Sequence, residues 1–337
     1  MHIPYATAVA SQPQSLRHSG EAVAKALRQS DLSAWRGGRI TLVGMGASRN
    51  ALRVALAELC RAGINARLAT AADFVDDRLA DLSDAVVVVS QSGLSTETYE
   101  ALQAAGELPR LVLTGDRGSP VGMSGMPTID LHLLSDSAVY TVGFTATLQA
   151  LGMFTEYVVG GAVTDGWPKL AEQVDSELAA TLDFARTAAA KLESVSSIDL
   201  VGAGAAEGIA AELALLFREA CYLPAAALST REYLHGPMES LQAGQAVIAI
   251  GGTRERQLAV DAALIGAVAI LITSDELSSA DGVITHRLPP SEGIQRAILE
   301  VVAGQRIVGE LAQLLGRAIN GFRYEQGDIK LGDHGLA

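Results

Sequence analysis

The sequence predicts an α/β protein made of two copies of one unit, each a five-stranded parallel sheet with helices on both faces. Short apolar runs alternate with helical stretches along the 337 residues, which is typical of parallel sheets that are buried on both sides. The apolar runs of the first half also recur in the second half, in the same order, at an offset of 158 to 161 residues. The length suits about two domains.

The internal repeat rests on three matches. Strand 39–43 leads into Gly44-Met-Gly-Ala-Ser48, and strand 198–201 leads into Gly202-Ala-Gly-Ala-Ala206 at an offset of 158. Val86–Val89 corresponds to Val247–Ile250, and Leu111-Val-Leu-Thr-Gly-Asp116 corresponds to Ile270-Leu-Ile-Thr-Ser-Asp275. Three matches in one order indicate a duplication and not chance.

The expected elements follow from these runs. Strands are expected at 39–44, 66–69, 85–90, 110–114 and 128–133, and again at 197–202, 224–228, 246–251, 269–273 and 283–288. Helices are expected at 14–29, 49–63, 95–106, 206–221, 254–266 and 291–316. A helix from Pro168, a favourable first-turn residue, to about Glu193 joins the halves. The expected domains are therefore 1–165, with the N-terminal helix, and 166–337, with the joining helix and the C-terminal tail.

Composition limits the classes of function. The formal net charge of −13 argues against nucleic acid as a partner, and no apolar run is long enough for a membrane span. No Cys/His cluster has the spacing of metal ligands, so no metal or other cofactor is expected. Cys60 and Cys221 are predicted to be buried, reduced thiols. With no secretory signal at the N-terminus, we expect a cytoplasmic protein.

The most informative stretch is V-V-V-V-S-Q-S-G-L-S-T at 86–96. A strand buried on both faces ends here in small hydroxyl residues, and a helix follows. Free N–H groups at a helix N-terminus attract phosphate, hydroxyls add donors, and Gly93 permits a tight turn. The sequence therefore predicts an anion site, with simple capping of the helix by Ser95 or Thr96 as the alternative.

A second loop, Gly44-Met-Gly46, resembles the start of a nucleotide-binding motif. Arg49 stands where the third glycine of that motif belongs, and no acidic residue ends the next strand near Ala69. We therefore interpret Gly46 and Ser48 as a second wall of a phosphosugar pocket. The alternative is a plain strand-to-helix turn. Ligands sit beyond the carboxyl ends of parallel strands, so both loops are expected side by side.

The second half carries Glu219 and, sixteen residues later, His235. Glu219 lies near the C-terminal end of an apolar helix, where the helix dipole and partial burial both raise the pKa of a carboxyl group. Such a group can act as a base between adjacent carbons, and an imidazole in a turn can open a sugar ring. The alternatives are a surface salt bridge of Glu219 with Arg218 or Arg231, and a turn histidine bonded to backbone.

These residues resemble the double sugar isomerase (SIS) domain family over nearly the whole chain. Ser90-Gln-Ser-Gly93 and Tyr233-Leu-His-Gly-Pro-Met238 match its S-Q-S-G and K-H-G-P signatures. The resemblance implies two tandem flavodoxin-like SIS domains and a homodimer with a shared active site. It also implies a sugar phosphate as the small-molecule partner.

The resemblance also assigns roles to residues. Ser90, Gln91, Ser92 and Ser95 match the positions that hold the sugar phosphate, and Gly46, Ala47 and Ser48 match the loop that contacts the sugar. Glu219 matches the proton-transfer base. His235 matches the ring-opening residue that reaches into a site on the partner subunit. Lys330 matches a lysine that closes over the sugar, where it would form an imine or place charge near the developing enolate.

The expected function is therefore a phosphosugar isomerase or deaminase that acts at C1/C2 by proton transfer, without a glutaminase domain. Some family positions differ here, namely Ala47 in the sugar loop, Val139-Tyr-Thr-Val142 in place of A-S-T-K, and Leu216 in place of a lysine. The altered Val139–Val142 segment favours a first alternative, a non-catalytic regulator that binds a sugar phosphate. A second alternative is a deglycase that splits a sugar-phosphate amine adduct with the same base and histidine.

Overall fold

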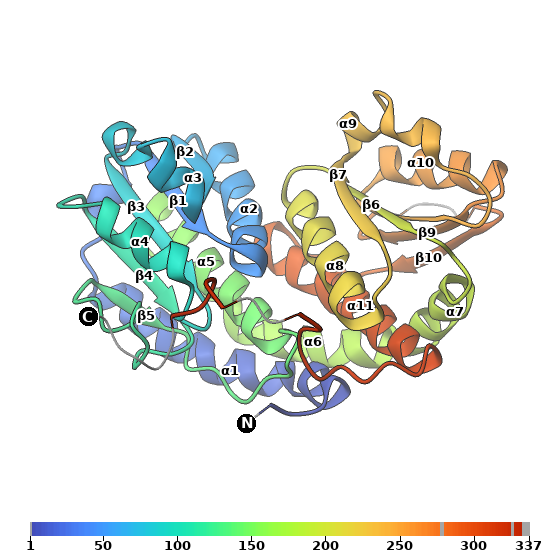
Figure 1. The fold of residues 1–337 in the computed structure, drawn as a ribbon, viewed down its shortest axis with the longest axis horizontal. Coiled ribbons are helices and arrows are strands. Elements are labelled where there is room, and N and C mark those ends of the chain that lie inside the picture. Colours follow the sequence, from blue (N-terminus) through green and yellow to red (C-terminus); the bar gives the residue numbers. More distant parts are fainter. Residues whose placement is uncertain (1, 277–279, 325–326, 332–337) are drawn as a thin grey trace. The chain divides into compact units, whose positions relative to one another are not determined.

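A computed structural model describes residues 2–276, 280–324 and 327–331. The chain divides by its contacts into two units, each of which contains one of the two sheets in Figure 1. The first-sheet unit comprises Gln14–Leu134, Val142–Pro168 and Phe322–Ala337. The second-sheet unit comprises Met1–Pro13, Ser135–Thr141 and Lys169–Gly321. Each unit thus includes short segments from the other half of the sequence.

The two sheets share one topology. The first contains β1 (Ile40–Gly44), β2 (Ala66–Thr70), β3 (Ala85–Ser90), β4 (Arg110–Thr114) and β5 (Thr128–Asp130), in the order β2-β1-β3-β4-β5. The second contains β6 (Ile198–Gly202), β7 (Ala225–Ser229), β8 (Ala246–Ile250), β9 (Val268–Thr273) and β10 (Val283–Arg287), in the order β7-β6-β8-β9-β10. All pairings are parallel. Both orders are 2-1-3-4-5, the flavodoxin-like arrangement, which confirms the predicted duplication.

Helices cover both faces of each sheet. In the first-sheet unit these are most of α1 (Tyr5–Gln29) and all of α2 (Gly46–Arg61), α3 (Ala71–Asp76), α4 (Thr96–Ala104) and α5 (Val142–Gly160). The second-sheet unit holds most of α6 (Trp167–Ala180) and all of α7 (Leu182–Leu192), α8 (Ala205–Cys221), α9 (Thr230–Tyr233), α10 (Thr253–Leu264) and α11 (Gly293–Leu314). Short 3-10 turns at Ser33–Trp35, Leu79–Leu82 and Pro237–Ser240 complete the described elements.

Several helices differ from expectation, and the short helices α3 and α9 were not predicted. Helix α5 was not predicted, because its residues are buried nearly all round and therefore show no alternation between apolar and polar faces. The joining helix is interrupted at Thr181, so it forms α6 and α7. Helix α1 begins at Tyr5 and not at residue 14, and it accommodates Pro13 in its interior.

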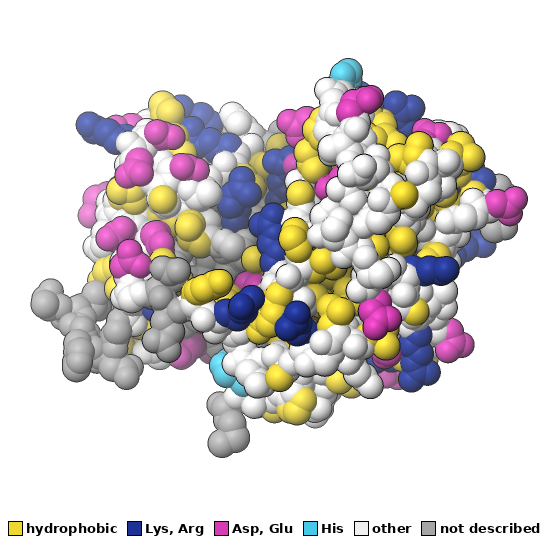
Figure 2. All heavy atoms as spheres, turned by 45° about the vertical axis from the view of Figure 1, so that its right-hand side comes forward, with side chains coloured by type: hydrophobic (Ala, Val, Ile, Leu, Met, Phe, Trp, Pro, Cys, Tyr) yellow, Lys and Arg dark blue, Asp and Glu magenta, His cyan; other side chains and the backbone are white. Residues whose placement is uncertain are grey.

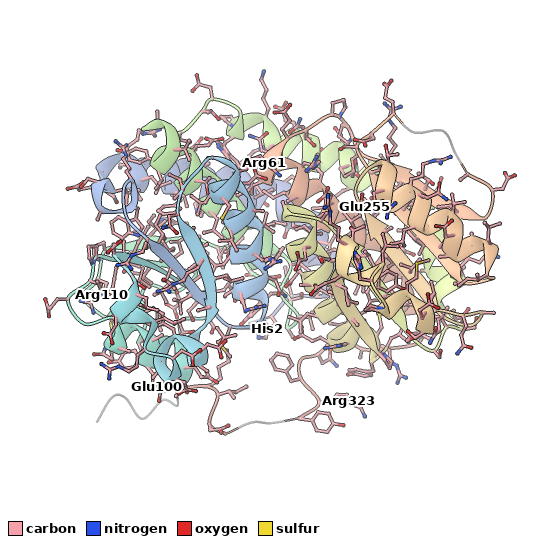
Figure 3. All side chains as sticks on the ribbon, turned by 90° about the horizontal axis from the view of Figure 1, so that it is seen from above. His2, Arg61, Glu100, Arg110, Glu255 and Arg323 are labelled. Carbon is pink, nitrogen blue, oxygen red and sulfur yellow. The ribbon has the colours of Figure 1, made fainter. Side chains whose placement is uncertain are left out.

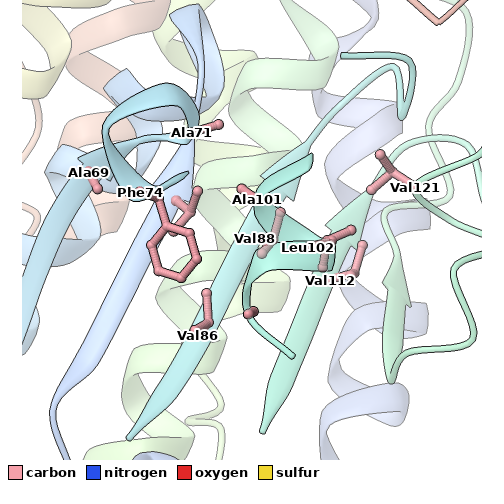
Figure 4. Packing of buried hydrophobic residues seen from close by; sticks show 11 residues of the cluster. Ala69, Ala71, Phe74, Val86, Val88, Ala101, Leu102, Val112 and Val121 are labelled. Atoms are coloured by element: carbon pink, nitrogen blue, oxygen red, sulfur yellow. The ribbon is translucent and has the colours of Figure 1, made fainter. Parts of the chain in front are cut away.

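The core of the first sheet explains why its strands are so apolar. All six residues of β3 are buried, because helices cover both of its faces. On one face, Val86 and Val88 pack with Phe74 of α3 and Leu102 of α4 (Figure 4). Helices α2 and α5 pack together on the opposite side of the sheet. This packing fixes the carboxyl end of β3, where the serine-rich turn begins.

The two cysteines are free thiols that differ in exposure. Cys221 is buried as predicted, and burial raises the pKa of its thiol to about 12. Cys60 is exposed, so its predicted burial is wrong. It lies in the last turn of α2 beside the exposed Arg61, where the helix faces solvent.

The surface carries charges of both signs, which are interspersed on the face drawn in Figure 2. None of the described helices combines the length and apolar character that crossing a bilayer requires. Among the described residues, no group of three His, Cys, Asp or Glu side chains could hold a metal ion.

Helix α11 buries a carboxyl group in the second-sheet unit. Glu300 is 3% exposed, and its Oε1 lies 3.4 Å from the Arg296 Nε, whereas its Oε2 has no hydrogen-bond partner among the described residues. Burial raises the pKa of Glu300 to about 7, and Arg296 opposes this shift. The ionised form therefore destabilises the native state.

We expect Glu300→Gln to stabilise the protein at pH 8 by about 1 to 3 kcal/mol, since a pKa unit corresponds to about 1.4 kcal/mol. The native pKa lies above the unfolded one, so the cost of ionisation develops as pH rises from about 4.5 to 7. The gain should shrink toward zero below pH 5. Urea unfolding at pH 8 and pH 5 measures it, with the exposed Glu193→Gln as control. An equal gain at both pH values would contradict the assignment.

Candidate functional site

The serine-rich turn, Ser90–Thr96, joins β3 to α4. Ser90 ends β3 opposite Thr114 of β4, and the Gly93 N–H donates to the Ser90 carbonyl over 3.1 Å. Gly93 adopts a φ of +65°, a left-handed conformation that glycine tolerates best. The tight turn at Gly93 is therefore confirmed, and it lets α4 begin at Thr96.

The segment that follows β4 supports the serine-rich turn through backbone hydrogen bonds. The Gly115 N–H donates to the Gln91 carbonyl over 2.9 Å, and the Val121 N–H donates to the Gly93 carbonyl over 3.2 Å. A Cβ placed on Gly93 would meet the Ser119 Oγ at 1.8 Å, so the two segments are in close contact. Sequence reasoning did not identify these supporting residues. The polar residues at the end of β4, the strand next to β3, are a signal that could have identified them.

Several polar groups of the turn are available to a ligand. Ser90 is 4% exposed, and its hydroxyl hydrogen-bonds to no described residue. The buried Oε1 of Gln91 also has no partner among the residues that the structure describes. Ser95 occupies the N-cap position of α4, but its hydroxyl donates to the Glu97 carboxylate over 3.1 Å and does not cap the helix. Simple capping by Ser95 is therefore not its role, and an oxyanion such as phosphate suits the turn.

The glycine-containing loop lies at the same edge of the sheet. Strands β1 and β3 are neighbours, with Gly44 opposite Val89. Gly46, Ala47 and Ser48 form the first turn of α2, where Gly46 is exposed and has a φ of +50°. The prediction that the two loops lie side by side is confirmed. That these three residues contact a sugar stays a prediction.

The C-terminal segment 329–331 pairs with the serine-rich turn. Ser95 and Lys330 form an antiparallel bridge, with the Thr96 N–H donating to the Ile329 carbonyl over 3.3 Å. The Leu331 N–H donates to the Leu94 carbonyl over 2.7 Å. The side chain of Lys330 then reaches back, and its Nζ donates to the Ser92 Oγ over 3.3 Å. Partial burial lowers the pKa of Lys330, and the Glu97 carboxylate opposes that shift.

Glu219 lies in the last turn of α8 and is half-buried. Burial raises the pKa of its carboxyl group to about 7, as predicted. A salt bridge with Arg218 or Arg231 would lower this pKa, so the salt-bridge alternative does not describe Glu219. A carboxyl group that titrates near neutral pH can take up and release a proton under physiological conditions.

Tyr140 is a neighbour of Glu219 that the sequence did not reveal. Its segment, Ser135–Thr141, belongs to the second-sheet unit, and the Asp136 carboxylate fixes it by accepting from the N–H and the hydroxyl of Thr141. Burial raises the pKa of Tyr140, with smaller contributions from the negative charges of Asp136 and Glu219. A phenol thus stands within electrostatic reach of the candidate base.

His235 lies in the turn between α9 and the Pro237–Ser240 helix. Its backbone N–H donates to the Glu232 carbonyl over 3.0 Å, and Gly236 follows with a φ of +141°. The side chain of His235 is exposed. Tyr233, two residues before His235, anchors this turn, because it is buried and donates its hydroxyl to Asp199 over 2.8 Å.

The equivalent turn of the second sheet is filled by a side chain of the protein itself. Glu255 lies in the first turn of α10 (Figure 3), and its Oε2 accepts from the Gly252 N–H over 3.0 Å. Its Oε1 accepts from the Thr230 hydroxyl over 2.5 Å, and Glu255 is 6% exposed. A carboxylate therefore occupies the place where the first sheet presents open serines. The open form of this turn is therefore found in the first-sheet unit.

The predicted residues fall into two groups. The first group belongs to the first-sheet unit and comprises the serines predicted to bind phosphate, Gln91, the Gly46–Ser48 loop and Lys330. Pairing of β1 with β3, and of the tail with the serine-rich turn, brings this group to one edge of the first sheet. Glu219 and His235 belong to the second-sheet unit.

Comparisons with known proteins agree with this architecture. Residues 191–301 match the SIS domain family. The chain is 28% identical over 316 residues to a protein of Aeropyrum pernix named glutamine–fructose-6-phosphate aminotransferase (isomerizing). The aligned part covers 84% of this chain and 49% of that protein, so this chain spans about half the length of that curated relative.

Two solved structures share nearly the whole fold. The C-terminal domain of a glucosamine-fructose-6-phosphate aminotransferase from Francisella tularensis has a TM-score of 0.78 at 18% identity, covering 95% of this chain and 98% of that one. A glucosamine-6-phosphate deaminase from Thermotoga maritima has a TM-score of 0.77 at 18% identity, covering 94% and 96%. Residues 191–301 therefore match a SIS domain, and the likeness to these two structures shows a shared double-sheet fold.

Proposed function

We propose that this protein is a phosphosugar isomerase or deaminase that moves a proton between C1 and C2 of a ketose or aminosugar phosphate. Ser90, Ser92 and Ser95, with Gln91, hold the phosphate, and the loop from Gly46 to Ser48 contacts the sugar. His235 opens the ring, Glu219 transfers the proton through an enol or enolamine, and Lys330 covers the substrate.

The observation that carries this proposal is the pairing of two chemistries in one chain. A serine-rich turn at the N-terminus of α4 suits a phosphate, and a half-buried carboxyl group with a pKa of about 7 suits a base. The printed names of the relatives support the substrate class, since they act on fructose 6-phosphate or glucosamine 6-phosphate.

A panel of sugar phosphates tests the proposal. Because a ligand of the native state raises apparent stability, the correct sugar phosphate should raise the Tm, whereas the corresponding unphosphorylated sugar should not. In heavy water, the protein should then catalyse exchange of the C1 or C2 hydrogen of that sugar phosphate. Absence of any stabilising sugar phosphate from a panel of ketose and aminosugar phosphates would contradict the proposed substrate class.

A second candidate function is a regulator that binds a sugar phosphate without turning it over. The segment Val139-Tyr-Thr-Val142, which lacks the family's serine and lysine, favours it. The hydrogen-exchange measurement separates the two functions, because a regulator would be stabilised by the ligand and would catalyse no exchange. Substrate tests with amine adducts of sugar phosphates identify a deglycase.

The proposal includes a homodimer in which His235 acts on the partner's substrate. Glu219→Gln and His235→Asn should each inactivate the protein, but a mixed dimer would keep one site with both wild-type groups. Random mixing of the two variants after reversible dissociation should therefore restore about a quarter of wild-type activity, given twofold symmetry. A mixture that stays inactive, although subunit exchange is demonstrated with labelled chains, would contradict the shared site.

A further inference from the structure

The two roles expected for Lys330, an imine with the sugar and a charge near the developing enolate, both act at the carbonyl end of the sugar. An imine requires the amine to reach the carbonyl carbon of an open-chain sugar. A side chain that binds the phosphate group of the sugar must instead lie at the serine-rich turn. The Nζ of Lys330 donates to the Ser92 Oγ over 3.3 Å, and Ser92 is one of the proposed phosphate-holding hydroxyls. The ammonium group therefore already stands at the anion site.

Backbone pairing delivers Lys330 to this place. Two main-chain hydrogen bonds, one on each side of Lys330, tie Ile329 and Leu331 to the residues around Ser95. Antiparallel pairing sets the register, so the side chain of Lys330 starts next to Ser95 and reaches Ser92 on the same turn. The pairing also uses the Thr96 N–H, which is one of the first N–H groups of α4. The tail thus removes a neutral donor from the anion site and supplies a charged one.

Electrostatics at the turn favour a cation beside a bound phosphate. Glu97 lies in the first turn of α4, and its carboxylate accepts from the Ser95 hydroxyl over 3.1 Å. A negative charge beside the turn opposes the binding of phosphate, whereas the Lys330 ammonium offsets that charge. A charge-assisted hydrogen bond to phosphate is about twice as strong as a neutral one.

We propose that Lys330 is a ligand of the substrate's phosphate group, brought to the serine-rich turn by the pairing of segment 329–331 with residues 94–96. This inference rests on the proposed function, because it concerns the same anion site. It assigns Lys330 to substrate binding and leaves the carbonyl end of the sugar to other groups.

Inorganic phosphate is the probe that isolates this role, since it contains no carbonyl group with which an imine could form. We expect Lys330→Met to weaken phosphate binding, measured by titration calorimetry, by about 10- to 100-fold. Lys330→Arg keeps the charge and should stay within about threefold of wild type. Glu97→Gln should bind phosphate as tightly as wild type or more tightly. Lys191→Met, at an exposed lysine of α7, is the control and should change nothing.

The outcomes separate the two proposals. Wild-type affinity for phosphate in Lys330→Met, with an unchanged Tm, would overturn the role of Lys330 and leave the proposed function standing. Reduction with borohydride of the protein bound to its best sugar phosphate provides a second measurement. An imine forms from the amine and the carbonyl with loss of water, and hydride addition to its C=N bond fixes the sugar on Lys330. A covalent adduct on Lys330 would overturn the inference. A wild-type protein that binds neither phosphate nor any sugar phosphate would overturn both.

Discussion

Glu219→Gln is expected to lower turnover by about 10²- to 10⁴-fold, the usual contribution of a general base, with the affinity for the sugar phosphate unchanged within a few-fold. Glutamine keeps the size of the side chain but cannot accept a proton from carbon. Because burial already places the pKa of Glu219 at about 7, the neutral side chain also suits its surroundings. Loss of turnover without loss of binding or stability would identify Glu219 as the base.

The pH dependence gives a second measure of the same group. The proposed base Glu219 can accept a proton only when it is ionised, so kcat/KM should rise with pH and level off above about pH 7. Below that value, the rate should fall about tenfold per pH unit, because the ionised fraction of the carboxyl group falls in that proportion. This acidic limb should disappear from the residual activity of Glu219→Gln.

Arg218→Gln is the matched control, since Arg218 is the exposed neighbour of Glu219 on α8. It should leave both the rate and the pH profile close to those of wild type. Wild-type turnover in Glu219→Gln, on a substrate that wild type converts, would exclude this residue as the base.

Gly93→Ala is expected to abolish phosphate binding at the serine-rich turn and to destabilise the protein by about 2 kcal/mol or more. Alanine pays a steric cost at the φ of +65°, and its Cβ would meet the Ser119 Oγ at 1.8 Å. Relief of this clash must move the turn that presents Ser90 and Ser92. Calorimetric titration with phosphate and urea unfolding measure the two effects.

A second glycine separates conformational cost from the clash. Gly106 has a φ of +56°, but beyond its chain neighbours no described residue lies within 4 Å of the position that its Cβ would take. Gly106→Ala should therefore destabilise the protein by about 1 to 2 kcal/mol without changing phosphate affinity. Adding Ser119→Gly to Gly93→Ala should restore part of the stability, because it removes the group that collides. Equal phosphate affinities in Gly93→Ala and wild type would show that this turn does not bind the anion.

The strands and the duplication were predictable because burial on both faces leaves a strong local signal. The four consecutive valines of Val86–Val89 can be a strand buried on both sides, and their counterpart Val247–Ile250 repeats the pattern in β8. The serine-rich turn was predictable for a similar reason, since Gly93 and its flanking serines are adjacent in sequence. Helix α5 escaped prediction, because complete burial erased the polar face that makes a helix recognisable.

The residues of the candidate site also divide into those with a local sequence signal and those without one. Ser90, Ser92 and Glu219 carry signals in their own neighbourhood, namely a strand end, a helix start and an apolar helix. Glu255 carries none that distinguishes it from any first-turn glutamate, and its position in the turn of the second sheet required a fold in which it meets Gly252 and Thr230. The exposure of Cys60 likewise depends on which side of α2 meets solvent.

Sequence reasoning was enough to predict the α/β class, the duplicated parallel sheets and the two loops at one sheet edge, because each depends on residues that lie close together along the chain. Tertiary structure alone decided that the pKa of Glu219 lies near 7, that a carboxylate fills the second turn, and that Lys330 meets Ser92. Desolvation and pairing between residues 238 positions apart arise only when the folded chain brings their neighbours together.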